Sequence, residues 1–312
     1  MMADMLDPVR SPVAVVGVPT ALGGHFAGME LSPAELRRLG LLDRLAGIEI
    51  RDSGDLAIEP GFRPDPDPRA KNRELIAAML SRLADHVATV LGDQPETRLL
   101  ILGGDCTAHA GTLAGINRAR PDARIGLAWF DAHGDFNTPD TTPSGNVWGM
   151  PFAMIVGRGD PDLVGAAAGP TVRMEDAALL GGQVLDEQES RDLAACPVAH
   201  FGAGMLAQPA GRAALDAWAR SLPVDLLYVA FDVDAIDASE RVAVAMPEPH
   251  GLMLGTALEA LRVLAAARPV LAFGATGVSL ANGDPDRTVE VVAALTSAAL
   301  DGQPATGISA SP

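Results

Sequence analysis

Cysteine is scarce in this 312-residue sequence, in which Cys106 and Cys196 are the only two. Two cysteines are too few for a disulfide framework, and they lack the paired CxxC spacing of a structural zinc site. This scarcity favours a reducing, cytoplasmic setting. Positive charge is also short, with 23 Lys and Arg against 40 Asp and Glu and a formal net charge of −17. Such a surplus of negative charge repels phosphate backbones and anionic lipids, so we expect no nucleic-acid partner and no membrane surface.

The sequence also lacks a recognisable targeting signal or membrane span. Its first twelve residues, MMADMLDPVRSP, contain acidic residues and a proline where a signal peptide needs a basic region and an apolar run. A late apolar stretch over residues 263–278 is broken by Arg268 and Pro269. That stretch is too short to cross a hydrocarbon layer of about 30 Å. We therefore expect a soluble protein.

What the sequence does contain is a regular alternation of short apolar runs with longer Ala/Leu/Arg-rich segments of helical period, from residue 13 to about residue 300. This alternation predicts an α/β fold with a parallel sheet covered on both faces. No composition shift marks a linker, so we expect one domain over residues 1–312, with flexible ends at 1–11 and 303–312. The expected strands are 13–18, 48–52, 98–102, 124–130, 198–201, 226–231 and 270–273, and the clearest expected helices are 33–45, 71–91, 107–119, 210–222, 255–267 and 288–300.

Polar side chains follow three of these strands at the carboxyl end, which is the edge where open α/β sheets bind ligands. Residues two apart on an extended chain face the same way, so each group would converge on one place. The candidate ligands are Asp131, His133 and Asp135 after the strand at 124–130, Asp232 and Asp234 after 226–231, and Cys106 in the glycine turn after 98–102.

Four of these candidate ligands are aspartates. Either acidic motif taken alone would equally suit a solvated turn or a helix N-cap. Together, at three strand ends, they suit a pair of hard divalent cations, and oxygen-rich sites favour Mn or Mg over Zn or Cu. Four carboxylates would balance two divalent ions, whereas without a cation they would repel one another in the crevice. The sequence therefore predicts a metal site.

Several motifs carry a resemblance to a known family. They are Asp52-Ser53-Gly54-Asp55-Leu56 near the start, DAHGDFNTPDTTPSGN at 131–146 and FDVDAID at 231–237. With them, the chain resembles the arginase/agmatinase ureohydrolase superfamily over nearly its whole length. The resemblance implies an arginase-like three-layer α/β/α fold with a mostly parallel sheet, a dinuclear manganese centre, a homotrimer or homohexamer, and hydrolysis of a guanidinium C–N bond. It implies metal binding through Asp131, His133, Asp135, Asp232 and Asp234.

Two departures from the family pattern replace histidines. Cys106 stands where a family histidine binds the first metal, and a thiolate is a soft ligand poorly matched to manganese. That site would be weaker or prefer another metal, or Cys106 is an apolar filler beside a single ion. His109 is a possible substitute ligand, although we expect it at a surface position of its helix. Trp148 occupies the place of the arginase acid/base histidine, and an indole cannot transfer protons in this pH range.

Two further departures remove carboxylates. The glutamate that arginases and agmatinases place against the guanidinium has no counterpart in residues 275–286. Residues 202–207 lack the aspartate that arginases use near the substrate amino group. A cationic head would lose its counter-charge at the first of these places. All four departures count against ordinary hydrolysis of L-arginine.

Other residues of the family's substrate loop are kept. Hydroxyl and amide groups suit binding of an amino acid's carboxylate, although they also suit ordinary turns. Two loop histidines, His25 and His250, are candidates to replace the missing proton-transfer group, and Asp135 is the candidate to hold the attacking water as well as a metal. Trp148 would wall an apolar part of the substrate. The kept substrate-loop residues are Asn137, Thr142, Ser144 and Asn146.

These observations lead to one principal hypothesis and two alternatives. The principal hypothesis is a Mn-type hydrolase that cleaves a C–N bond of a small guanidino, amidino or ureido molecule other than ordinary L-arginine. A less basic head, such as an N-hydroxyguanidine, would tolerate the absent glutamate. We expect two Mn ions by resemblance, or one if Cys106 is no ligand. The alternatives are a non-catalytic ligand-binding or partner subunit and a conventional arginase or agmatinase.

Overall fold

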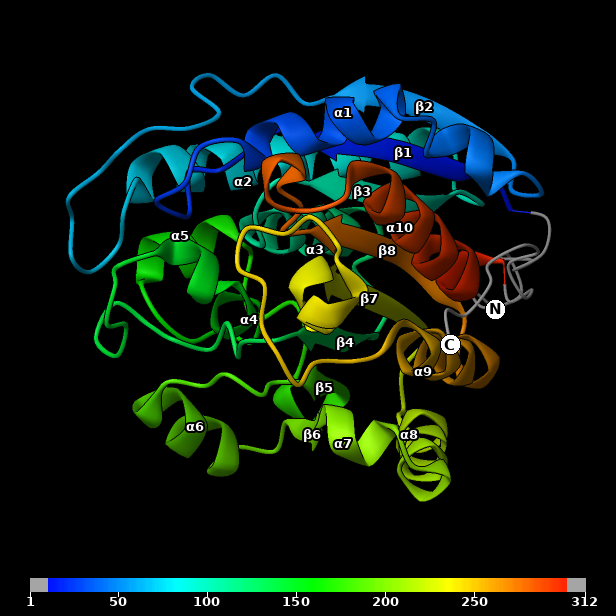
Figure 1. Cartoon of the computed structure of the whole chain (residues 1–312). Helices are drawn as coiled ribbons and strands as arrows, with labels where there is room; N and C mark the ends of the chain where they lie inside the picture. The colour runs from blue at the N-terminus through cyan, green and yellow to red at the C-terminus, as the bar shows by residue number, and fades with distance from the viewer. Residues whose placement is uncertain (1–10, 302–312) are drawn as a thin grey trace.

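Eight parallel strands form the centre of the computed structural model, which describes residues 11–301 (Figure 1). Their order across the sheet is β2-β1-β3-β8-β7-β4-β5-β6, and every neighbouring pair is parallel. The predicted α/β class with helices on both faces is confirmed. The strands are β1 Val13–Val18, β2 Ile50–Asp55, β3 Arg98–Gly103, β4 Ile125–Asp131, β5 Ala177–Gly181, β6 Ala199–Phe201, β7 Leu226–Asp232 and β8 Val270–Thr276.

Ten α-helices connect these strands within the described residues. The ends expected to be flexible, 1–11 and 303–312, lie outside the described residues except for Ser11, which is buried. The helices are α1 Ser32–Arg38, α2 Arg73–Asp93, α3 Thr107–Ala119, α4 Pro151–Ile155, α5 Pro161–Ala166, α6 Glu187–Ala194, α7 Ala203–Leu206, α8 Pro209–Ser221, α9 Leu254–Ala267 and α10 Pro285–Leu300.

Two of the sequence expectations need correction. The strand β5, Ala177–Gly181, was missed because its run of Ala and Leu lacks the β-branched and aromatic residues that mark strands. The helix expected over 33–45 is two elements, because α1 ends at Arg38 and Gly40 adopts a φ of 81° before the short 3-10 helix Leu42–Leu45. Only glycine reaches that left-handed conformation without strain.

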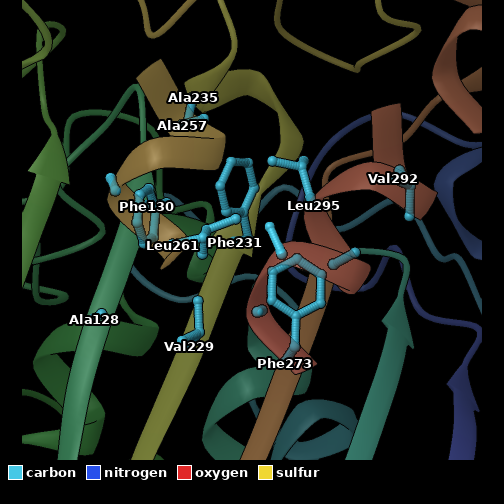
Figure 2. Packing of buried hydrophobic residues seen from close by; sticks show 14 of the residues in the cluster. Ala128, Phe130, Val229, Phe231, Ala235, Ala257, Leu261, Phe273, Val292 and Leu295 are labelled. Carbon is cyan, nitrogen blue, oxygen red and sulfur yellow. The ribbon is translucent and has the colours of Figure 1, made fainter. Parts of the chain in front are cut away.

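Side chains of the central strands alternate between two apolar layers, one on each side of the sheet. In β7, Tyr228 faces the layer that contains α2 and α3, whereas Val229 and Phe231 face the layer that contains α9 and α10. Figure 2 shows the second layer, in which Phe130, Phe231 and Phe273 come from three neighbouring strands. The ring centroids of the first two lie 4.8 Å apart. Both faces of the sheet are therefore buried, as parallel sheets require.

The helix α2 is long and apolar enough to cross a membrane by length and composition alone, with a mean hydropathy of 1.3. Its side chains Ile76, Leu80, Leu83 and Val87 are fully buried in the layer that also contains α3. Packing against the sheet thus accounts for the apolar face of this helix. No other helix in residues 11–301 passes the same test.

The strand order brings four carboxyl ends together in the middle of one sheet edge. β3, β8, β7 and β4 are consecutive neighbours, although they are far apart in the sequence. Cys106 follows β3, Gly277 follows β8, Asp234 follows β7 and His133 follows β4. The topology therefore converts separate motifs into one cluster, as expected for open α/β sheets.

We expect Phe231→Ala to lower the free energy of unfolding by about 3–5 kcal/mol, because the ring fills a fully buried position between two other aromatic rings. Urea unfolding of the purified protein measures this change. The matched control is Phe26→Ala, at a side chain that is 40% exposed, which should change the free energy of unfolding by less than about 1 kcal/mol. Equal effects of the two substitutions would contradict the assigned core.

Candidate functional site

A cavity of about 320 Å³ opens at the carboxyl ends of the central strands. It brings together all of the predicted metal-binding and substrate-loop residues. It also contains His25 and several residues that the sequence reasoning did not single out. The predicted residues that line it are Cys106, Asp131, His133, Asp135, Asn137, Thr142, Ser144, Asn146, Trp148, Asp232 and Asp234.

The candidate ligands form two groups that share Asp131. In one group the ligand atoms of Cys106, Asp131 and Asp135 lie within 4.8 Å of one another. In the other, the same limit holds for Asp131, His133 and Asp234. Asp232 lies beside the first group, since its Oδ2 accepts a hydrogen bond from the Cys106 thiol at 2.8 Å. A shared carboxylate between two ligand groups is the arrangement expected of two adjacent divalent cations.

The loop after β4 reaches this geometry by leaving the strand, which corrects the expectation of an extended chain. β4 ends at Asp131, and Asp135 adopts a φ of 48°, in the left-handed region. Such a conformation is uncommon for a residue with a side chain and often marks a functional position. A Cβ at Gly134 would come within 2.5 Å of the Glu189 carboxyl carbon, so the loop packs closely on α6. Asp135 is turned back towards the sheet by this path.

Burial and mutual repulsion disfavour the charged state of these carboxylates. Burial, and then the neighbouring Asp234, raise the pKa of Asp232 to about 7. Burial, and then Asp131, raise the pKa of Asp234 to about 6. Burial, and then the charge of Asp131, also raise the pKa of Asp135. Cations at this place would relieve the repulsion.

Two unsatisfied atoms support the fit of a cation. Within residues 11–301, the buried Oδ2 of Asp135 has no hydrogen-bond partner. Nδ1 of His133 faces the carboxylates of Asp131 and Asp234 at 3.3 and 3.2 Å. Nε2 of His133 is also buried and without a hydrogen bond. Oxygen and imidazole donors of this kind suit Mn, and the residues present therefore fit divalent metal ions.

Cys106 is 4% exposed and faces the acidic cluster. Burial, followed by the charges of Asp232 and Asp135, raises the pKa of its thiol. Its sulfur also lies 3.2 Å from the hydroxyl of Thr276 at the end of β8. Without a metal ion, Cys106 is therefore a protonated thiol that donates to Asp232, and it is placed to become a ligand when a cation replaces that proton.

His109 is fully buried, so the expected surface position is wrong. Its Nδ1 lies 2.8 Å from the Tyr228 hydroxyl, and its Nε2 lies 3.1 Å from the Thr276 hydroxyl. Burial lowers its pKa to about 3, so the ring is neutral. His109 thus supports Thr276, which contacts Cys106, and does not itself line the cavity.

A chain of hydrogen bonds orients the entrance of the cavity. Nζ of Lys71, the only lysine in the sequence, donates to Oδ1 of Asn146 at 2.7 Å. The Nδ2 of Asn146 therefore faces Nδ1 of His25, at 2.9 Å, which leaves the His25 proton on Nε2. Burial, and then the charge of Lys71, lower the pKa of His25. Its ring lies 5.4 Å from that of Trp148, between centroids.

The two candidate proton-transfer histidines differ in position. His25 lines the cavity, whereas His250 lies on an exposed turn and is not among the lining residues of the described chain. His250 also adopts a φ of 65°, which places it in a tight turn before α9. The geometry thus brings only the first of the two histidines to the candidate ligands.

Besides Asp105, in the turn before Cys106, three carboxylates in the cavity were not predicted from the sequence. Asp186 and Glu189 follow β5, the strand that was not predicted, and Glu248 lies in the loop between β7 and α9. The strand-end rule would have identified the first two if β5 had been recognised. Residues 202–207 do not line the cavity, so their lack of an aspartate does not affect it, whereas Asp186 lines it from the loop after β5.

Asp186 and Glu189 also shape the wall of the cavity. They form a capping box at the start of α6, and Glu189 additionally accepts from the backbone N–H of Phe136 at 2.8 Å. Nδ2 of Asn137 donates to Asp186 at 2.9 Å. Burial raises the pKa of Glu189 to about 7. The substrate loop and α6 are therefore locked together beside the candidate ligands.

The segment after β8 offers no carboxylate to the cavity, as the sequence predicts. Gly277 lines the cavity there with a φ of 77°. A Cβ at this position would come within 2.0 Å of Oδ1 of Asp232. The close approach of Asp232 therefore excludes any larger residue without movement of the candidate ligand.

Comparisons with known proteins agree with this geometry. The Arginase family model matches residues 11–301. Arginase from Bacillus caldovelox is 30% identical over 291 residues, covering 91% of this chain and 96% of that protein. The crystal structure of arginase from Bacillus cereus matches with a TM-score of 0.84 and 28% identity, over 94% of this chain and 99% of that one.

A more distant solved structure shares the fold. Formimidoylglutamase from Bacillus subtilis matches with a TM-score of 0.73 and 20% identity, over 96% of this chain and 91% of that one. The sheet order, the strand-end carboxylates and the match over nearly the whole chain point to the same conclusion. The chain belongs to the arginase family of hydrolases.

Proposed function

We propose that this protein is a metal-dependent hydrolase that cleaves a C–N bond of a small guanidino, amidino or ureido molecule, and that ordinary L-arginine is not its main substrate. The observation that carries the proposal is the pair of ligand groups sharing Asp131 inside a cavity of small-molecule size. Family membership supports the reaction class. The residue changes at Cys106 and Trp148 support a substrate other than that of conventional arginases.

Two Mn ions are the proposed cofactors, and the two ligand groups that contain Asp135 and His133, with Asp131 common to both, would hold them. Bound there, they would supply Lewis acidity and lower the pKa of a water molecule. Cys106 makes the first group softer than the second, so the two positions should differ in metal affinity. We infer from family membership that the chain works in the cytoplasm and assembles as a trimer or hexamer. Size-exclusion chromatography with light scattering tests the assembly.

The side chains of this chain have distinct proposed tasks. Asp135 accepts a proton from the attacking water, since its Oδ2 is free of hydrogen bonds. Asp135 then returns this proton to the leaving nitrogen. His25 takes the place of the histidine that Trp148 replaces by donating a hydrogen bond from Nε2–H to the reacting group, because its Nε2 carries the proton and its ring borders the cavity. Asn137, Thr142, Ser144 and Asn146 bind a polar or anionic end of the substrate, and Lys71 adds positive charge behind Asn146.

One observation favours a second candidate function. The Cys106 thiol keeps its proton through burial and through the Asp232 contact, which opposes metal binding in one of the two groups. A protein with only one tightly held ion would suit ligand binding without turnover, alone or as a partner of an active relative. Metal content and product release separate this candidate from the hydrolase.

The hydrolase should release urea or the corresponding fragment from at least one compound in a panel of guanidino, amidino and ureido acids and amines, assayed after loading with Mn. Asp135→Asn should lower this rate by about 100-fold or more, because it removes both a candidate ligand and a proton acceptor. Asp140→Asn, on an exposed part of the same loop, is the matched control and should retain the rate. No release from any member of the panel would refute the hydrolase and favour the ligand-binding candidate.

Sulfur coordination by Cys106 should be visible in the cobalt-loaded protein as a thiolate-to-metal charge-transfer band. We expect Cys106→Ser to abolish the band and Cys106→His to raise the affinity for the second Mn by roughly tenfold, because imidazole suits this metal better than thiolate. Cys196→Ser is the control, since Cys196 is a free cysteine that does not line the cavity. A band that survives Cys106→Ser would show that this cysteine is no ligand.

The raised pKa values predict a pH dependence of stability with opposite signs in metal-free and metal-loaded protein. Asp232 and Asp234 have pKa values of about 7 and 6 when folded, above the unfolded value of about 3.9, so the folded state binds more protons. Their contribution is present below about pH 4 and is lost as pH rises through 6 to 7. Metal-free protein should therefore become less stable from pH 6.5 to 8, above the range in which protonation of His109 in the unfolded state opposes this trend.

With Mn present, ionised carboxylates bind the cation, and stability should instead rise over the same interval. Thermal unfolding at the two pH values, with chelator and with Mn, measures both slopes. Asp232→Asn removes one of the two groups and should flatten the slope of the metal-free protein. Parallel slopes in the two conditions would contradict the assignment of a cation to this cluster.

A further inference from the structure

We propose that Glu248 supplies the counter-charge for a cationic head group, so that the substrate class is a guanidinium or amidinium compound and not a neutral ureido compound. The inference rests on the proposed function of the same cavity and narrows it. Glu248 replaces, from a different loop, the carboxylate that is missing after β8. With Glu248 in this role, the missing carboxylate after β8 no longer requires a substrate with a less basic head group.

Glu248 is held at the cavity by its own loop. It lies between Pro247 and Pro249, whose rings restrict the backbone on both sides. Its carbonyl oxygen accepts from the backbone N–H of Ala238 at 3.0 Å. The side chain is 24% exposed, and Oε1 lies 3.8 Å from Nε2 of His133. A candidate metal ligand and this carboxylate are therefore immediate neighbours.

The carboxylate of Glu248 is not used by the fold. Asp186 and Glu189 accept hydrogen bonds from Asn137 and from backbone N–H groups, and Asp105 accepts from the N–H of Gly23. Within residues 11–301, the oxygens of Glu248 accept no hydrogen bond, and they form no ion pair with Lys or Arg; the imidazole of His133 is 3.8 Å away. The carboxylate is therefore available to accept hydrogen bonds from a ligand in the cavity.

The charge balance of the cavity also favours a cation. Two divalent ions would be balanced by the four candidate aspartates, Asp131, Asp135, Asp232 and Asp234. Asp186, Glu189 and Glu248 also line the cavity, and of these three only Glu248 accepts no hydrogen bond among the described residues. A planar guanidinium offers paired N–H donors to a carboxylate, whereas a neutral ureido head offers donors but no charge. Glu248 would therefore favour the charged guanidinium compound over the neutral ureido compound.

A competing role for Glu248 is to orient His133, whose Nε2 proton would need an acceptor if Nδ1 binds the metal. The two roles respond differently to substitution. Gln keeps an acceptor oxygen at this position but removes the charge, whereas Ala removes both. Metal binding reports the orienting role, and discrimination between charged and neutral ligands reports the counter-charge.

The experiment titrates Mn-loaded wild-type, Glu248→Gln and Glu248→Ala proteins by calorimetry with matched guanidino and ureido compounds. The probes are 4-guanidinobutyrate with 4-ureidobutyrate, and L-arginine with L-citrulline. We expect the wild type to bind at least one guanidino member about tenfold or more tightly than its ureido partner. Glu248→Gln should remove most of this preference and leave Mn stoichiometry unchanged. Glu290→Gln, on the outer helix α10, is the matched control.

The outcomes separate the inference from the proposed function. Wild-type protein without a guanidino preference, or a Glu248→Gln variant that keeps it, overturns the role of Glu248. Loss of Mn in Glu248→Ala, with full ligand preference in Glu248→Gln, also overturns it and assigns the orienting role instead. Release of urea or a related fragment is assayed in the same samples. A guanidino preference without product release refutes the hydrolase while leaving the counter-charge in place.

Discussion

Repulsion among buried carboxylates is the constraint on which the rest of the site depends. Parallel strands bring Asp131 and Asp232 to adjacent positions at one edge of the sheet, and the following turns add Asp135 and Asp234. Each charge is buried near another of the same sign, which raises the pKa of these groups. The fold tolerates this arrangement because the apolar layers on both faces of the sheet are extensive. A bound cation would turn the repulsion into binding energy.

The surrounding hydrogen bonds hold the carboxylates in place for such binding. Asp131 accepts from the indole N–H of buried Trp129 at 3.0 Å, and Asp234 accepts from the backbone N–H of Ala132 at 3.1 Å. Backbone N–H groups within the turns satisfy one oxygen of Asp131 and one of Asp232. Both oxygens of Asp131 thus accept hydrogen bonds, whereas Oδ2 of Asp135 accepts none among the described residues. Support of this kind determines ligand orientation as strongly as the choice of ligands.

Much of this arrangement could be predicted from the sequence because strand ends follow a simple rule. Apolar runs ending in Asp131 or Asp232 mark both the sheet and the site, whichever loops follow. What could not be predicted depends on long-range packing. β5 has too weak a strand signal, so Asp186 and Glu189 were missed together with it. The burial of His109 depends on contacts with Tyr228, 119 residues away.

The departures from the family pattern fall unevenly on the two ligand groups. The group of Asp131, His133 and Asp234 keeps hard donors throughout. In the other group, the sulfur of Cys106 contacts the hydroxyl of Thr276, which also contacts Nε2 of His109. Gly277 lies so close to Asp232 that a Cβ at this position would overlap its carboxylate. A Cβ at Gly274 would meet His109 and Tyr228 at 2.7–2.8 Å, so Cys106 and the residues behind it form one closely packed unit.

Such mutual fit argues against random decay of an arginase site, because each replaced side chain is hydrogen-bonded or closely packed. The changes concentrate on the soft ligand group and on the segment that lost a carboxylate, whereas Glu248 enters from the opposite loop beside the unchanged group. Under the proposed function, the ligand group that contains His133 would keep hard donors, and Glu248 beside it would place the cationic contact on that side of the cavity.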